Sequence, residues 1–391
     1  MTKIVGMKKT TTDYYCSQKF TWLSVDLEKQ ITQSCCQAQI SKIDLTWLKQ
    51  HPGKLFNTPL LLKERQEMLD NQPVASCENA CWIPEKNNRI SRRIIDQSYK
   101  QTHLNLESTP ETLAITLGSN CNLTCSYCCK FHSSTWLQDI IKNGPYLEQD
   151  RFSVTNQDRI LLKISQREMA DSDNFNILLD ELTQFTNVPI VRIGGGEPFL
   201  YNNLPTLLAG MTECKDITIN TGLGVDHNRF CRQLDKIQHL KNLELIVSAE
   251  NINKFYEFNR YGNSYENFIR NVNAIKSRNI KLSFNSVLSN LTIFGLPEFV
   301  EEFNSSPIHY SPCYDPDFLA PNVLDSTSID QLAKKIDQSQ ILIKDEIIQS
   351  LYSPNTRIQQ ENLSIYLAEF ARRRNLDLAI FPASMLQWLS I

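Results

Sequence analysis

The chain has 391 residues, of which 41% are apolar and 21% are charged, the composition of an ordinary globular protein with room for two or three domains. Its formal net charge of −3 gives no reason to expect a nucleic acid as partner. No apolar run reaches the roughly 18 residues of a membrane span, and no signal-peptide core follows the basic N-terminal residues. We therefore expect a cytoplasmic protein that binds neither membranes nor nucleic acids.

The twelve cysteines are clustered along the chain. In a cytoplasmic protein this usage indicates metal or redox chemistry rather than a disulfide framework. Eight of them form three groups, which are Cys35/Cys36, Cys77/Cys81 and Cys121/Cys125/Cys128/Cys129. The scattered ones, Cys16, Cys214, Cys231 and Cys313, are expected to be small buried hydrophobic side chains.

Residues 1–110 show no repeating pattern of strands and helices. One amphipathic helix is predicted over about 59–69, with an apolar side made of Leu60, Leu61, Leu62, Met68 and Leu69. The two cysteine pairs that flank this helix lie about forty residues apart. Together they can supply three or four ligands to one metal centre.

The stretch Cys121-Asn-Leu-Thr-Cys125-Ser-Tyr-Cys128 directly follows a predicted strand at 112–117. Three thiols at this spacing on one loop can hold three corners of a cubane iron–sulfur cluster and leave its fourth iron without a protein ligand. The alternatives are buried free thiols or a zinc site, which would need Cys129 or His132 as its fourth ligand.

Strand–helix alternation follows this loop and predicts parallel strands joined by helical crossovers. The six predicted strands are 112–117, 189–193, 216–220, 243–249, 280–287 and 307–311. Helices are predicted near 203–213, 227–240, 264–278 and 296–304, and 144–187 is interpreted as an insertion. From about Pro321 the pattern is helical, over 328–351 and 357–374, with Ser326 or Ser328 as N-cap. Arg372, Arg373 and Arg374 are expected to face water at a helix end.

Polar and glycine residues follow several of these strands, where α/β barrels bind their ligands. The second strand runs into Gly194-Gly195-Gly196-Glu197-Pro198, whose backbone can approach a ligand closely and whose carbonyls or carboxylate can receive an ammonium group. The third strand ends at Asn220 and the fourth at Ser248-Ala-Glu250. The planar guanidinium group of Arg260 can bind a carboxylate, or Arg260 is a solvated surface charge. Asn285 is a weaker candidate for the same pocket.

The CxxxCxxC loop followed by GGEP resembles the radical S-adenosylmethionine (radical SAM) superfamily. This resemblance implies an α/β fold with a partial (β/α)6 barrel over 111–320, followed by a helical extension over 321–391. It implies a [4Fe–4S] cluster on Cys121, Cys125 and Cys128 that binds S-adenosylmethionine (SAM). The implied SAM contacts are Gly195, Gly196, Glu197 and Pro198 at the methionyl amino group, Tyr127 at the adenine, Asn220 near the bound molecule, and Ser248, Glu250 and Arg260 at its ribose and carboxylate.

The N-terminal region resembles the twitch module, which a subset of this superfamily carries ahead of the barrel. The residues that carry this resemblance are Cys35/Cys36, Cys77/Cys81, Glu85 and Ser91-Arg92-Arg93. The Ser133-Ser-Thr-Trp136 run resembles the same subset. The implied cofactor of residues 1–110 is a second, auxiliary [4Fe–4S] cluster held by some of Cys35, Cys36, Cys77 and Cys81, with one of the adjacent pair as a spectator. A structural zinc on the same thiolates is the alternative.

The function implied by this resemblance is reductive cleavage of SAM to a 5′-deoxyadenosyl radical, which abstracts hydrogen from a peptide or a small natural-product precursor. The auxiliary cluster would assist a net oxidation, and a flavodoxin- or ferredoxin-type protein would be the electron donor. The alternatives are a radical SAM methyltransferase or rearrangement enzyme, and a non-catalytic zinc- or iron–sulfur-binding interaction protein.

Overall fold

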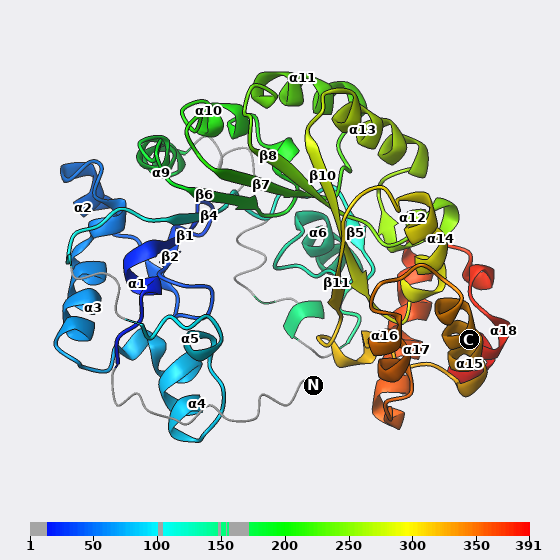
Figure 1. Cartoon of the computed structure of the whole chain (residues 1–391). Helices are drawn as coiled ribbons and strands as arrows, with labels where there is room; N and C mark the ends of the chain where they lie inside the picture. Colours follow the sequence, from blue (N-terminus) through cyan, green and yellow to red (C-terminus); the bar gives the residue numbers. More distant parts are fainter. Residues whose placement is uncertain (1–13, 101–104, 148–149, 154, 156–171) are drawn as a thin grey trace. The chain divides into compact units, whose positions relative to one another are not determined.

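The computed structural model describes residues 14–100, 105–147, 150–153, 155 and 172–391. The chain divides into two compact units, which Figure 1 colours along the sequence. The first unit contains residues 1–116, 171–192 and 207–216, and the second contains 117–170, 193–206 and 217–391. The domain boundaries at 110 and 320 stay predictions, and part of the predicted insertion at 144–187 lies outside the described residues.

The first unit contains a small sheet. Its strands are β1 (Trp22–Asp26), β2 (Ile31–Gln33), β3 (Ser41–Lys42) and β4 (Thr112–Thr116). β1 pairs with β4 in parallel and with β2 in antiparallel, and β2 pairs with β3. Only β4 was predicted from the sequence, because β2 and β3 are too short to show an alternating pattern and the parallel partner of β1 lies far along the chain.

The helical segments of the first unit are short. They are α1 (Gln18–Thr21), α2 (Leu45–Gln50), η1 (Leu55–Asn57), α3 (Pro59–Leu69), η2 (Ala75–Cys77), η3 (Glu78–Trp82), α4 (Ile83–Lys86), α5 (Arg92–Ile95) and α9 (Asp173–Thr183). The predicted bounds of α3 are confirmed, and Thr58 caps it by accepting from the backbone N–H of Leu61.

The predicted apolar side of α3 is wrong in part. Leu60 is exposed, whereas Glu64 and Arg65 are buried. Arg65 points inward because its guanidinium donates to the carbonyl oxygens of Lys19 and Phe56, each at 2.8 Å. A buried charge that finds such acceptors no longer costs its full desolvation energy.

The second unit contains a parallel sheet (Figure 1). β7 (Asp216–Thr221), β8 (Leu243–Ser248), β10 (Lys281–Leu288) and β11 (Ile308–Pro312) pair in that order, all in parallel. The connections contain α11 (His227–Ile237), α12 (Asn253–Asn259), β9 (Arg260–Tyr261), α13 (Tyr265–Ser277), η6 (Ile293–Gly295) and α14 (Leu296–Glu302). Two boundaries between the units fall within secondary-structure elements, one in β6 (Ile190–Gly194) and one in α10 (Leu204–Leu208).

All six predicted strands are present within one or two residues of their predicted bounds, and the predicted α/β fold is confirmed. β11 lies at the end of the strand order, so the described parallel strands form an open sheet rather than a closed barrel. The remaining short elements of this unit are β5 (Thr124–Cys125), α6 (Ser134–Asn143), η4 (Asp150–Phe152), η5 (Pro198–Leu200) and η7 (Asp317–Leu319).

The C-terminal region is helical, as predicted. Its elements are α15 (Ser326–Asp337), α16 (Lys344–Leu351), α17 (Arg357–Arg374), η8 (Leu378–Ile380) and α18 (Ala383–Leu389). The predicted N-cap is wrong: Asp325 caps α15, and its carboxylate accepts from the backbone N–H of Ser328 at 3.0 Å. No described helix has both the length and the hydropathy of a membrane span.

The expectation that the arginines at the end of α17 face water is wrong for two of them. The side chains of Arg373 and Arg374 are only 2% and 4% exposed. Both pair with Asp139 of α6, and the Arg373 guanidinium lies 3.8 Å from the centre of the Tyr146 ring. Arg372 remains exposed.

Candidate functional site

The structure brings Cys121, Cys125 and Cys128 together on the loop that follows β4. Cys121 and Cys125 are buried against Leu123, and Cys128 is partly buried against the same cluster. The middle of the loop is fixed by pairing of β5 with β9, in which Cys125 lies opposite Arg260. The predicted grouping of these three thiols is therefore present in the fold.

The pKa values of these thiols also reflect their proximity. Burial raises the pKa of Cys121 to about 12, and repulsion from Cys125 adds to the rise. The pKa of Cys128 is raised by burial and then by Cys125, Cys129 and Cys121. Because iron is ligated by thiolates, loading a cluster here must release protons.

The residues after the loop hold its backbone in place. Thr135 Oγ1 donates to the carbonyl oxygen of Cys121 at 2.5 Å, and Ser134 Oγ accepts from the Cys121 N–H at 3.1 Å. The indole N–H of Trp136 donates to the carbonyl oxygen of Cys125 at 3.0 Å. The Ser-Thr-Trp run at the start of α6 therefore fixes two of the three cysteines, a role that the sequence pattern did not reveal.

The C-terminal helix α17 holds the same loop from a distant part of the sequence. The Tyr366 hydroxyl donates to the carbonyl oxygen of Ser126, and Arg374 donates to Thr124 Oγ1 at 3.0 Å. Around them packs an aromatic cluster of Trp136, Tyr146, Phe152, Phe318, Tyr366 and Phe370. Sequence analysis missed these positions because the contacts span 240 and 250 residues.

The GGEP turn at the end of β6 lies directly against the entrance of the cysteine loop. The Gly196 N–H donates to the carbonyl oxygen of Gly118 at 2.7 Å. A Cβ atom on Gly196 would lie 2.4 Å from the carbonyl oxygen of Asn120, and one on Gly195 would lie 2.7 Å from that of Gly118. Only glycine permits this approach of two backbones.

Glu197 is buried, with an exposed fraction of 1%. Its carboxylate accepts from Thr221 Oγ1 at 2.7 Å and from the N–H groups of Gly222 at 2.9 Å and Phe199 at 3.2 Å. Burial raises the pKa of this carboxyl group, and these hydrogen bonds oppose the rise. The carboxylate thereby joins the end of β6 to the end of β7.

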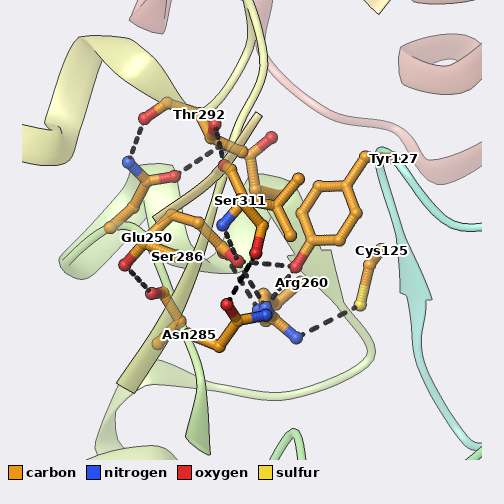
Figure 2. A network of polar contacts seen from close by, with 12 residues as sticks. Cys125, Tyr127, Glu250, Arg260, Asn285, Ser286, Thr292 and Ser311 are labelled. Carbon is orange, nitrogen blue, oxygen red and sulfur yellow. Dashed lines mark hydrogen bonds and ion pairs between the residues drawn. The ribbon is translucent and has the colours of Figure 1, made fainter. Parts of the chain in front are cut away.

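Figure 2 shows a buried polar network beside the cysteine loop. Arg260 and Glu250 are 3% and 1% exposed, so the surface-charge alternative for Arg260 is wrong. Their side chains form an ion pair at 2.5 Å, and the Tyr127 hydroxyl donates to the Glu250 carboxylate at 2.7 Å. Arg260 also donates to Tyr127 Oη and, at 3.7 Å, to the Sγ of Cys125. Three predicted SAM-contacting residues thus lie in one network that reaches the thiol of Cys125.

The other predicted residues lie at strand ends. Asn220 is exposed at the end of β7, and a Cβ atom on Gly194 would lie 4.0 Å from its amide nitrogen. Ser248 is in register with Asn285, whose side chain accepts from Ser311 at 2.9 Å. Pro198 is buried in η5.

The zinc alternative stays a prediction. Among the described residues, no three His, Cys, Asp or Glu side chains are arranged to hold a metal ion of any kind. His132, one suggested fourth ligand, is exposed, and Cys129, the other, is buried.

The predicted N-terminal ligands do not all come together. Cys77 and Cys81 are buried in η2 and η3, and Cys35 is partly buried in the turn after β2. Repulsion from Cys35 contributes to the raised pKa values of both Cys77 and Cys81, after burial as the main cause. Cys36 is exposed, and the charged groups that act most on it are Cys35, Arg92 and Asp96.

Comparisons with known proteins were made by family, by sequence and by structure. Residues 115–304 match the family model of the Radical SAM superfamily. No curated protein sequence matches the chain. Among solved structures, it is similar to native anSMEcpe with bound AdoMet (15% identity, 52% of this chain and 51% of that chain, TM-score 0.31). It is also similar to native anSMEcpe with bound AdoMet and Kp18Cys peptide (14%, 58% and 59%, 0.36).

A third similar structure is Streptococcus suis SuiB bound to its precursor peptide SuiA (15% identity, 91% of this chain and 75% of that chain, TM-score 0.33). The chain spans about half the length of the first anSMEcpe structure that it matches. The family match covers the cysteine loop, the GGEP turn and the Arg260 network. Residues 115–304 therefore match a radical SAM domain.

Proposed function

We propose that this protein cleaves SAM reductively and abstracts a hydrogen atom from a peptide or a small natural-product precursor, as a net oxidation. One observation carries the proposal: three thiols of a single loop, two of them buried and one partly buried, meet beside a buried arginine network and a glycine turn that touches the same loop. A loop held this firmly is what a cofactor with an open coordination position requires.

The donor set fits a [4Fe–4S] cluster that uses Cys121, Cys125 and Cys128 as its protein ligands. When bound and reduced, such a cluster supplies the electron that breaks a C–S bond of SAM, and the resulting 5′-deoxyadenosyl radical takes hydrogen from the substrate. The protein's own task is to position the reactants and exclude water.

We assign the binding of SAM to the strand ends that surround the loop. The candidate contacts are Tyr127, Gly195, Gly196, Glu197, Pro198, Asn220, Ser248, Glu250 and Arg260. Because Glu250 and Arg260 are bound to each other, they also act as positioning residues that orient Tyr127 and shield Cys125.

We further propose an auxiliary [4Fe–4S] cluster in the first unit, which accepts an electron from the substrate or anchors it. The proposed electron donor is a flavodoxin- or ferredoxin-type protein, and the proposed location is the cytoplasm. The clustering of Cys35, Cys77 and Cys81 supports this second centre.

The test is anaerobic reconstitution of the full chain with iron and sulfide, reduction with dithionite, and assay of 5′-deoxyadenosine from SAM. The unaltered chain and the Cys129→Ala variant should form it, whereas Cys125→Ala should not. Iron-replete, reduced protein that forms none would overturn the proposal. Bound zinc in place of iron would instead favour the interaction-protein alternative.

A further inference from the structure

Four cysteines of the first unit come from three separate segments, and one of them, Cys16, lies outside the predicted ligand set. Cys16 lies just before α1 and packs in one buried cluster with Tyr15, Met68, Val74 and Cys77. This packing places Cys16 beside Cys77 in the core of the unit.

The other three cysteines are fixed around this point by the backbone. The N–H of Gln39 donates to the carbonyl oxygen of Ser76 at 2.8 Å, which joins the turn of Cys35 to the segment of Cys77. The π-helical turn η3 then carries the chain from Cys77 to Cys81. Cys36, the neighbour of Cys35, is exposed.

Buried cations accompany the four thiols. Lys19 is 2% exposed, and its ammonium group donates to Ser76 Oγ at 2.7 Å and pairs with Glu64 at 2.6 Å. Its charge lowers the pKa of Cys77 against the larger effect of burial.

Glu85, Ser91 and Arg93 connect the segment of Cys16 to Cys81. Arg93 donates to the carbonyl oxygen of Tyr15, next to Cys16, at 2.9 Å, and its guanidinium pairs with Glu85. Ser91 and the backbone of Arg93 act on Cys81 and lower its pKa against burial. This run therefore holds the Cys16 segment and Cys81 in the same place.

We propose that Cys16, and not Cys36, completes the four-cysteine ligand set of the auxiliary [4Fe–4S] cluster together with Cys35, Cys77 and Cys81. This assignment rests on the second centre of the proposed function and makes that centre fully ligated by the protein. A fully ligated cluster has no open iron, so it would exchange electrons rather than bind SAM or substrate.

The experiment uses the full chain with Cys121, Cys125 and Cys128 all changed to alanine, so that bound iron reports the auxiliary centre alone. After anaerobic reconstitution this background should hold roughly four irons and four sulfides per chain. Adding Cys16→Ala should reduce iron at least fourfold, whereas adding Cys36→Ala should leave it unchanged. Cys214→Ala, which removes another buried thiol of the same unit, is the matched control.

Cys16→Ser provides a second test that does not depend on complete loss of the cluster. Serine oxygen is a weaker ligand, so the reduced protein should keep an EPR signal with altered g-values, and Cys36→Ser should leave the signal unchanged. Iron loss in the Cys36 variants with full retention in the Cys16 variants would overturn the assignment. A background chain that binds no iron would overturn the auxiliary centre as well, while 5′-deoxyadenosine formation by the unaltered chain still decides the proposed reaction separately.

Discussion

Removing the Glu250 carboxylate should destabilise the second unit strongly, because Glu250 is the anion of a buried ion pair. Its side chain is 1% exposed and that of Arg260 is 4% exposed, at an N–O distance of 2.5 Å. Glu250→Ala would leave the Arg260 guanidinium without its counter-charge and the Tyr127 hydroxyl without its acceptor. Breaking a buried pair in this way costs about 3–5 kcal/mol.

The assay is urea unfolding of the iron-free protein, with the two single variants and the Glu250→Ala/Arg260→Ala double variant in one cycle. Because the double variant leaves no buried charge unpaired, its cost should fall at least about 2 kcal/mol short of the sum of the single costs. The control is Glu361→Ala, which breaks the exposed ion pair with Arg357 and should cost about 0–1 kcal/mol. Additive costs at Glu250 and Arg260 would refute the argument.

Three further predictions concern the contacts that hold the cysteine loop and the ion pairs of Glu369 in α17. Gly196→Ala should lower reconstituted iron severalfold because its Cβ would lie 2.4 Å from a backbone carbonyl oxygen. Gly194→Ala should load normally, because the nearest atom to its Cβ would be the side-chain amide nitrogen of Asn220, at 4.0 Å. Equal loading of the two variants would contradict the close approach. Tyr366→Phe leaves the buried Ser126 carbonyl without its donor, so urea unfolding should show a loss of about 1–3 kcal/mol, and an unchanged midpoint would count against this contact. Hydrogen bonds from the arginines of α17 lower the pKa of Glu369 from 4.5 to about 2. Because the folded-state pKa is the lower one, the stabilisation is present above pH 4.5 and is lost as the pH falls toward 2. Glu369→Gln should therefore cost up to about 1 kcal/mol at pH 6 and nothing near pH 2, and a cost that does not depend on pH would exclude this origin.

The parts of the fold that sequence analysis predicted are those whose signal is contiguous. The six strands are five to eight residues long, and the CxxxCxxC and GGEP motifs each occupy one loop. Parallel strands bring such loops to the same edge of a sheet, so their proximity follows from the strand order. The grouping of Cys121, Cys125 and Cys128 was predictable for the same reason.

The parts that sequence analysis missed depend on contacts between distant segments. In the sequence, Tyr366 and Arg374 are ordinary positions of a predicted amphipathic helix. Only the folded chain shows their hydrogen bonds to the cysteine loop. Cys16 stands alone in the sequence, far from the pairs that it joins. A single cysteine and a buried arginine carry no local pattern that separates them from a core thiol or a surface charge.

The central claim is that the loop of Cys121, Cys125 and Cys128 holds a cluster whose open iron binds SAM. The most direct measurement is EPR spectroscopy of the full chain in which Cys35, Cys77 and Cys81 are changed to alanine, so that only the loop holds iron. After anaerobic reconstitution and reduction, adding SAM should change the g-values of the cluster signal, because SAM becomes a ligand of the open iron. A spectrum that SAM leaves unchanged, at full iron loading, would contradict the claim.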